Sequence, residues 1–420
     1  MKLTNPWISQ IKHQDPATEI NLGSPTLVKL DSGELFAAHD YRWRGDIPKT
    51  EDKDKPGHRE AEGLPEARSH HADITDLEHD QYITSVYRSD DHGLTWELTA
   101  NIKKSWGGQL FVNRGSVYLI GALCGYGSLV IRRSDDWGST WTDPVDEDTG
   151  LLFRAGNENE PPNYHDVPSN VLKFEGRLYT AYENKHPVDS WKGFRAFVLS
   201  ADEDSDLLKD SSWRKSNEVV FPGDPAGRVD GWLEGNIVVD IDGQLCSVMR
   251  LQPEQGDDYF SGKTKYPLDK AAFLKIENEG RHLVNDPDRW CVDLPGAAAK
   301  FTIFRDNIGD RYWLIANDMF TGPPRVHRNI LSLFSSEDLS SWTRHTVLME
   351  DRYEKTPEES AWKTGFQYAD WQFDGDDIIY LVRTAYKGAP NYHDANRITF
   401  GRVEDFRKFS QGGEPWHTDS

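Results

Sequence analysis

The chain has 420 residues, of which 37% are hydrophobic and 12% aromatic, and its formal net charge at pH 7 is −22. This length allows a large buried core, and the negative charge argues against a nucleic-acid backbone or an anionic membrane as the partner. Any site for an acidic sugar therefore needs its own Arg, Lys or His side chains.

Cysteine usage and hydropathy exclude two further classes of protein. Cys124, Cys246 and Cys291 match neither a disulfide scaffold nor a metal-ligand spacing. The first residues lack the apolar stretch of a signal peptide, and no run approaches the roughly 18 apolar residues of a membrane span. We therefore expect a soluble cytoplasmic protein, or a secreted or periplasmic one if a leader has been removed.

The predicted elements in chain order are hairpins, each made of a strand, a Gly-centred turn and a second strand. Successive turn glycines are 82, 61, 67, 66 and 66 residues apart. Alternating apolar residues with Gly turns at this period are typical of propeller blades. The hairpins lie at 26–38, 110–120, 171–179, 237–245, 304–313 and 371–380, with turn glycines Gly33, Gly115, Gly176, Gly243, Gly309 and Gly375.

A second motif lies between these hairpins. Residues 89–96 and 134–141 both read S-x-D-x-G-x-T-W. Its Gly permits the positive φ of a tight turn, its Ser and Asp can bond the turn amides, and its Trp can pack beneath them. The pattern resembles the Asp-box of sialidase-like β-propellers, and 335–342 and 200–213 look like degraded copies.

These two motifs predict an all-β fold, a β-propeller with four-stranded blades. Six blades are countable, and a seventh would have to be hidden in 146–165, in 278–299 or in the termini. The long first gap holds a polar stretch at about 47–77, which we interpret as a loop insert. No linker divides the chain, so we expect 1–420 to form a single propeller domain.

Propeller geometry predicts where the functional residues lie. Residues before the first strand, after the second and before the third strand of each blade converge on one axial mouth, where a ligand site is expected. Several of them also have structural interpretations: His39 and His393 each adjoin an Asp, and Glu234 can pair with Arg250. The candidate site residues are His39, His79, Trp106, His165, Glu234, Lys300, Asn317, Gln367, Tyr368, Arg383, Tyr386 and His393.

Together the segments resemble the β-propeller family of L-rhamnose-α-1,4-D-glucuronate lyases and related α-L-rhamnosidases. The resemblance spans about residues 22–408, with the insert as the main departure. It implies seven blades, action on an oligo- or polysaccharide containing uronate or rhamnose, and a structural Ca²⁺ on the axis, although the sequence itself requires no cofactor. The segments that carry it are 23–26 with 38–40, 106–112, 131–134, 234–240, 300–303, 365–375, 383–386 and 393–396.

A lyase that eliminates at a 4-linked uronate must neutralise the carboxylate, remove a proton and protonate the leaving oxygen. Arg383 or Lys300 can neutralise the carboxylate, with Asn317 or Gln367 as uncharged donors. By resemblance His39 and His79 are the expected bases. Tyr368 or Tyr386 is the expected acid, with His165 and His393 as further candidates.

Three alternatives stay open. A rhamnosidase or other glycoside hydrolase needs two carboxylates, for which Glu234 and Asp370 are the candidates. A sialidase needs three arginines and a Tyr–Glu pair, and the early strand Gly23-Ser-Pro-Thr supplies no arginine. A non-catalytic sugar-binding propeller would use Trp and Tyr for stacking but has no need of several histidines.

Overall fold

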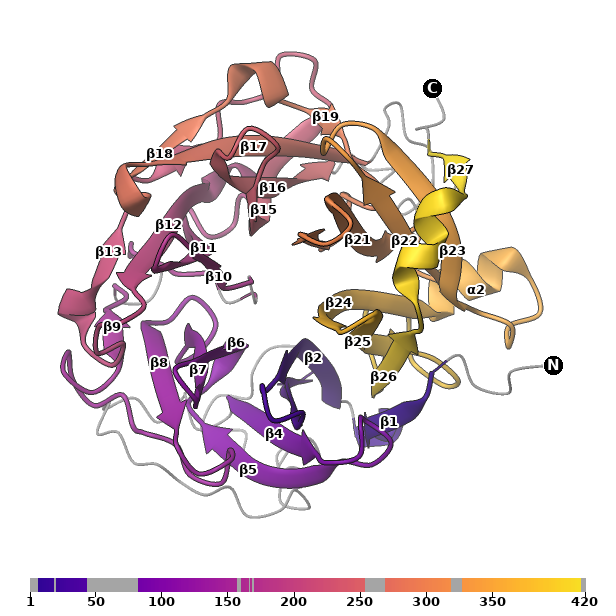
Figure 1. Ribbon diagram of the computed structural model, residues 1–420, viewed down its shortest axis with the longest axis horizontal. Helices are drawn as coiled ribbons and strands as arrows, with labels where there is room; N and C mark the ends of the chain where they lie inside the picture. The colour runs from indigo at the N-terminus through magenta and orange to yellow at the C-terminus, as the bar shows by residue number, and fades with distance from the viewer. Residues whose placement is uncertain are drawn as a thin grey trace.

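The computed structural model describes residues 7–18, 20–43, 82–156, 160–165, 167, 170–253, 269–318 and 327–416. Its strands form radial sheets around a central axis (Figure 1). Six sheets are present in these residues, each a run of antiparallel neighbours from the axis outward. The six-blade count from the turn glycines is confirmed, and the seven blades implied by the resemblance are wrong. Strands from the regions suspected of hiding a seventh blade instead complete the outer parts of blades 2, 4, 5 and 6.

The first three blades follow the chain from the inner to the outer strand. Blade 1 holds β2 (Ile20–Lys29), β3 (Leu35–Trp43), β4 (Ile83–Ser89) and β5 (Glu97–Lys103). Blade 2 holds β6 (Trp106–Asn113), β7 (Ser116–Ala122), β8 (Leu129–Ser134) and β9 (Leu151–Phe153). Blade 3 holds β10 (Leu172–Phe174), β11 (Arg177–Lys185), β12 (Phe194–Asp202) and β13 (Trp213–Lys215), and β14 (Val219–Val220) also pairs with β12.

The other three blades repeat this order. Blade 4 holds β15 (Val229–Val239), β16 (Leu245–Pro253), β17 (Lys270–Glu277) and β18 (His282–Asn285), with β19 (Val292–Asp293) beside β17. Blade 5 holds β20 (Thr302–Asp306), β21 (Arg311–Asn317), β22 (Ile330–Ser336), β23 (Trp342–Glu350) and β27 (Glu414–Pro415). Blade 6 holds β24 (Gly365–Asp374), β25 (Asp377–Ala385), β26 (Arg397–Val403) and β1 (Ser9–His13).

Short helices occupy connections between strands. The α-helix α2 (Pro357–Lys363) is capped by the Thr356 side chain, which accepts from the Glu359 amide. The 3₁₀ helices are η1 (Pro16–Thr18), η5 (Trp191–Gly193), η6 (Asp210–Ser212), η7 (Asn278–Gly280), η8 (Pro287–Arg289) and η9 (Phe406–Gln411). No helix in the described part of the chain is long and apolar enough to cross a membrane.

The ring closes because the two ends of the chain add strands to the last two blades. β1, near the N-terminus, pairs antiparallel with β26 and becomes the outer strand of blade 6. β27, near the C-terminus, pairs with β23 at the outside of blade 5. Circular packing of the blades leaves only their short outer strands as sheet edges, which limits edge-to-edge aggregation.

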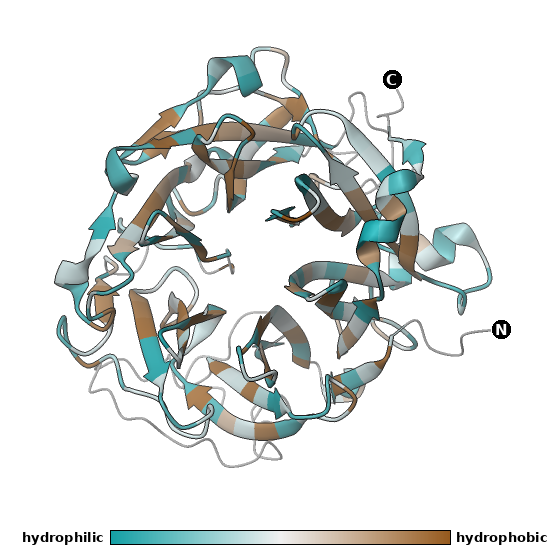
Figure 2. Cartoon of the chain, viewed as in Figure 1, coloured by the Kyte–Doolittle hydropathy of each residue, from teal (hydrophilic) through white to brown (hydrophobic). Residues whose placement is uncertain are grey.

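The hydrophobic core lies mainly between neighbouring blades. Figure 2 shows apolar residues along the strands and polar residues at the turns. Trp232, Trp313 and Trp371, on three different blades, are among the largest fully buried side chains. Each of them packs in a cluster that joins residues of two blades, so the blades stabilise one another rather than folding separately.

The Asp-boxes form the turns that the sequence predicted. In blade 2 the Ser134 hydroxyl accepts from the Gly138 amide at 2.9 Å, and Asp136 Oδ1 accepts from the Thr140 amide at 2.8 Å. The Trp141 indole donates to the Gly138 carbonyl at 3.0 Å and lies in the core cluster between blades 1 and 2.

We therefore predict that Trp141→Ala lowers the free energy of unfolding by about 3–5 kcal/mol, because a large buried ring is lost. Trp137 lies in the same turn but is 48% exposed, so Trp137→Ala should cost less than about 1 kcal/mol. Urea unfolding of both variants tests the expectation, and equal losses would contradict it.

Candidate active site

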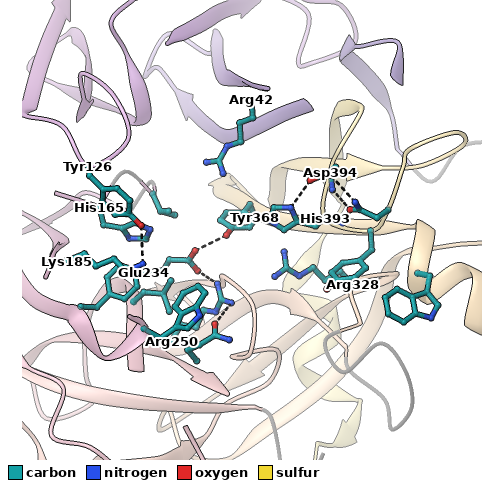
Figure 3. Close-up of a pocket in the computed structure, with 18 residues that line it drawn as sticks. Arg42, Tyr126, His165, Lys185, Glu234, Arg250, Arg328, Tyr368, His393 and Asp394 are labelled. Carbon is teal, nitrogen blue, oxygen red and sulfur yellow. Dashed lines mark hydrogen bonds and ion pairs between the residues drawn. The ribbon is translucent and has the colours of Figure 1, made fainter. Parts of the chain in front are cut away.

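A cavity of about 620 Å³ lies at the end of the axis where sequence geometry places the mouth. Its charged and aromatic walls come from at least four blades (Figure 3). Arg42 lies at the end of β3, Lys185 at the end of β11 and Arg250 on β16, while Glu234 and Tyr368 lie on the inner strands β15 and β24.

Two β-bulges orient the central pair of side chains. The register of β15 against β16 shifts between Leu233 and Asn236, and that of β24 against β25 shifts between Gln367 and Asp370. Glu234 and Tyr368 lie in these bulges with φ of 55° and 56°. Non-glycine residues adopt this left-handed conformation at a cost, and bulges of this kind re-aim side chains at functional sites.

The Glu234 carboxylate bonds both a tyrosine and an arginine. Its Oε1 accepts from the Tyr368 hydroxyl at 2.8 Å, and its Oε2 lies 2.6 Å from Arg250 Nη1. Burial alone would raise the pKa of Glu234, but the charge and hydrogen bond of Arg250 lower it to about 2. The carboxylate therefore stays ionised at neutral pH and accepts the hydrogen bond of the phenol.

Two further arginines face the cavity. Arg42 donates to Ser24 Oγ at 3.0 Å and stacks on the Trp106 ring, with its guanidinium carbon 5.0 Å from the ring centre. Arg328 donates to the Gln367 side chain and lies 6.0 Å from the centre of the Tyr368 ring. With Arg250 they place three guanidinium groups in the wall of the cavity that also holds Tyr368, which is a suitable arrangement for binding a carboxylate.

His393 and Asp394 line the side of the cavity near Arg328. His393 Nδ1 lies 3.0 Å from Asp394 Oδ1, and its Nε2 lies 3.2 Å from Nη2 of the buried Arg383. Because a guanidinium only donates, Nε2 must accept and the proton resides on Nδ1. Burial and the Arg383 charge lower the pKa of His393 to about 3, so this ring is neutral at pH 7 and a poor proton donor.

The opposite wall combines a histidine, a lysine and aromatic rings. His165 Nδ1 lies 2.8 Å from Glu183 Oε2, and both side chains are buried. Lys185 donates to the Tyr126 hydroxyl at 3.2 Å and lies 4.6 Å from the centre of the Phe194 ring. In Figure 3 His165 and Tyr368 lie on opposite sides of Glu234.

The predicted site residues fall into four groups. Four line the cavity, namely His165, Glu234, Tyr368 and His393. Four more contact the residues that line it. Arg383 stacks on Tyr368, Gln367 and Asn317 bond the side chain and the carbonyl of Arg328, and Trp106 stacks on Arg42. Lys300 is buried beside Glu234 and Asp370, and burial lowers its pKa.

The remaining three predicted residues are not placed in the cavity. His39 is fully buried between Tyr41 and Tyr87, and burial lowers its pKa to about 3. Tyr386 packs edge-on against Trp7 with 5.5 Å between ring centres and does not line the cavity. His79 and the 47–77 insert lie outside the described residues.

Sequence reasoning did not identify Arg42 as a site residue. Because the early strand at Gly23 holds no arginine, it weighed against a sialidase-like site. The structure supplies that charge from the neighbouring strand. A Cβ at Gly23 of β2 would lie 2.3 Å from Arg42 Nε, so the arginine occupies the space that a side chain on residue 23 would fill. A glycine on β2 together with an arginine on β3 is the signal that could have identified it.

The described residues contain no group of three or more His, Cys, Asp or Glu arranged to hold a metal ion. On the axis Asp370 instead accepts from the Leu27 amide at 2.8 Å and from Gln109 at 3.1 Å. The structural Ca²⁺ implied by the resemblance stays a prediction.

No family model matches the chain, and no curated protein matches its sequence. Among solved structures, the Hadza microbial sialidase Hz136 is 14% identical with a TM-score of 0.55, over 94% of this chain and 68% of that chain. An α-L-arabinofuranosidase from Fusarium graminearum, in complex with an iminosugar inhibitor, is 11% identical with a TM-score of 0.56, over 96% and 99%. Trypanosoma rangeli sialidase in complex with sialic acid is 12% identical with a TM-score of 0.54, over 98% and 60%. At these identities the likeness shows the fold alone, a β-propeller.

The Glu234–Arg250 pair predicts a pH dependence of stability. Because the pKa of Glu234 is lowered from 4.5 to about 2, its contribution is complete above pH 4.5 and is lost as the pH falls toward 2. Glu234→Gln leaves Arg250 buried without a counter-charge, so it should cost about 3–5 kcal/mol at pH 6, and less at pH 3.

Urea unfolding of wild type and variant at both pH values measures this difference. Glu337→Gln, which removes the exposed partner of Arg311, is the control and should cost less than about 1 kcal/mol at either pH. A Glu234→Gln cost that is constant with pH would contradict the assignment.

Proposed function

We propose that this protein is a retaining glycoside hydrolase of the sialidase type, which releases a sugar acid whose anomeric carbon carries a carboxylate. The observation that carries the proposal is the 2.8 Å hydrogen bond from Tyr368 to the ionised Glu234, in a cavity faced by three arginines. Neighbours with this fold include enzymes named for sialic acid and for arabinose. The arginines favour the acidic sugar over the neutral one.

The choice of tyrosine follows from the charge of such a substrate. Most retaining glycosidases use a carboxylate as nucleophile, whereas sialidases use a tyrosine. A carboxylate nucleophile would approach the anomeric carbon against the repulsion of the substrate's own carboxylate. A neutral phenol avoids this repulsion, and Glu234 can take its proton as the new bond forms.

The proposed reaction has two steps. First, Tyr368 Oη bonds to the anomeric carbon, its proton passes to Glu234, and the bond to the leaving sugar breaks as His165 protonates the leaving oxygen. Second, water attacks the anomeric carbon and gives its proton to His165. As water attacks, the bond to Tyr368 breaks with its electron pair on the phenol oxygen, which recovers the proton from Glu234.

Each cation has a part in binding. Arg42, Arg250 and Arg328 would hold the carboxylate of the substrate, since guanidinium groups pair with carboxylates through two parallel hydrogen bonds. The opposite wall, with Lys185, Tyr126, Trp191 and Phe194, would contact the rest of the sugar through stacking and hydrogen bonds.

Elimination at a uronate, expected from the resemblance, has weaker support. Arginines would also neutralise a uronate, but His39, the expected base, is fully buried and has no access to a ligand. A rhamnosidase acting on a neutral sugar would not need three cavity-facing arginines. A rhamnose–glucuronate polysaccharide is therefore included in the test as the alternative substrate.

Incubation of the protein with sialyllactose should release free sialic acid, and NMR of the first product should show retained configuration at the anomeric carbon. Tyr368→Phe should reduce kcat by about 100-fold or more, because the nucleophile is lost. Tyr386→Phe, outside the cavity, should leave kcat unchanged. Release of an unsaturated uronate from a rhamnose–glucuronate polysaccharide, with sialosides inert, would indicate a lyase instead.

The role of His165 as general acid gives a separate prediction. Protonation by a general acid increases the rate most for substrates with poor leaving groups. His165→Gln should lower kcat for sialyllactose by about 100-fold while changing kcat for an aryl sialoside with an acidic phenol by less than about threefold. Glu183→Gln, which removes the carboxylate charge beside His165 but keeps an oxygen for the Gly235 amide, should show the same selectivity to a smaller degree. Equal losses on both substrates would exclude His165 as the acid.

A further inference from the structure

Arg383 differs from the three arginines that face the cavity. It lies on β25 directly across from Gln367 of β24, and its side chain is 1% exposed. Arg42, Arg250 and Arg328 line the cavity, whereas Arg383 does not. Its guanidinium carbon lies 5.0 Å from the centre of the Tyr368 ring, so it contacts the proposed nucleophile rather than the space for the substrate.

The guanidinium is held in place from the side away from the tyrosine. Nη2 donates to the His393 carbonyl at 2.5 Å and to His393 Nε2 at 3.2 Å, and Asp394 fixes the tautomer of that ring. Nε and Nη1 have no hydrogen-bond partner in the described residues. These two buried nitrogens carry three N–H groups, and leaving them unpaired is costly, which indicates that the position serves something other than packing.

The charge of Arg383 can act on the Tyr368 ring. Burial and the charges of Arg42 and Arg328 lower the pKa of Arg383 to about 9, so it is still a cation at neutral pH. A cation over an aromatic face is attracted by the ring, and the attraction is larger when both groups are shielded from water. It grows when the ring gains negative charge, as a tyrosine does while its oxygen attacks or leaves a sugar carbon.

We propose that Arg383 is a positioning residue that stabilises the negative charge developing on the Tyr368 ring in both steps of glycosyl transfer. The inference rests on the proposed function, since it names how that nucleophile is activated. The groups around Tyr368 have different roles in activating it. Glu234 takes the proton at the hydroxyl, Arg328 lies 6.0 Å from the ring centre on the cavity side, and Arg383 acts from behind the wall.

The first experiment separates this role from carboxylate binding. In Arg383→Met, kcat for an aryl sialoside should fall by about 10- to 30-fold, the range that a shielded cation–π contact supplies. The dissociation constant of free sialic acid should change by less than about threefold. Arg383→Lys keeps the charge and should recover most of kcat. A weaker binding constant with unchanged kcat would overturn the proposal.

A double variant tests whether Arg383 acts through Tyr368. Tyr368→Phe combined with Arg383→Met should be no slower than Tyr368→Phe alone, because the charge that Arg383 stabilises no longer forms. Additive losses would overturn the proposal in favour of a direct contact with the substrate.

A last measurement needs no turnover, so it distinguishes failure of this inference from failure of the proposed function. The protein is labelled with 3-fluorotyrosine, and the resonance of position 368 is identified by its absence in Tyr368→Phe. The pH at which this fluorophenol ionises should be higher in Arg383→Met than in wild type, with Arg383→Lys close to wild type. Identical titrations in folded samples of all three would overturn the inference, even if sialosides are hydrolysed. If Arg383→Met does not fold, Arg383→Gln takes its place.

Discussion

The buried charge of Glu234 is the constraint on which the arrangement of the site depends. A carboxylate that is 4% exposed is stable only with a counter-charge and satisfied oxygens, and Arg250 and Tyr368 supply both. Arg250 lies on β16 of the same blade as Glu234, whereas Tyr368 lies on β24 of blade 6, so both oxygens are satisfied only when blades 4 and 6 are held in place around the axis. The fold and the site are therefore coupled, and the N-terminal β1 completes the blade that carries the tyrosine.

The cavity and the protein as a whole have opposite charges. The chain carries −22 in total, whereas the cavity wall presents Arg42, Arg250, Arg328 and Lys185 against Glu234 and Asp394. Surface charges act over only about 10 Å at ordinary salt concentrations, so the arginines inside the cavity set the charge that a ligand meets there. A propeller with an acidic exterior can therefore accept an acidic sugar, provided that its positive groups converge on the axis.

The repeats made the fold predictable, because each Gly turn and each Asp-box depends on residues within about ten positions of one another. The same reasoning identified Glu234, Tyr368, His165 and His393 as residues at the mouth, since it used only their place relative to a strand. It gave no means of choosing among them. His39 occupies an equivalent place in blade 1, yet its ring is fully buried between two tyrosines. Which way a side chain turns at a strand end depends on bulges and on neighbouring blades, which a local pattern does not contain.

Arg42 shows why such a site is hard to recognise from one strand at a time. This guanidinium of the cavity wall comes from β3, and the empty space for it comes from Gly23 on β2. A side chain at residue 23 and an arginine at residue 42 cannot both occupy that space, so the two positions are coupled by exclusion. The stacking of Arg42 on Trp106 then fixes the guanidinium from blade 2. The positive charge of the cavity wall is therefore a property of the assembled ring, to which different strands contribute.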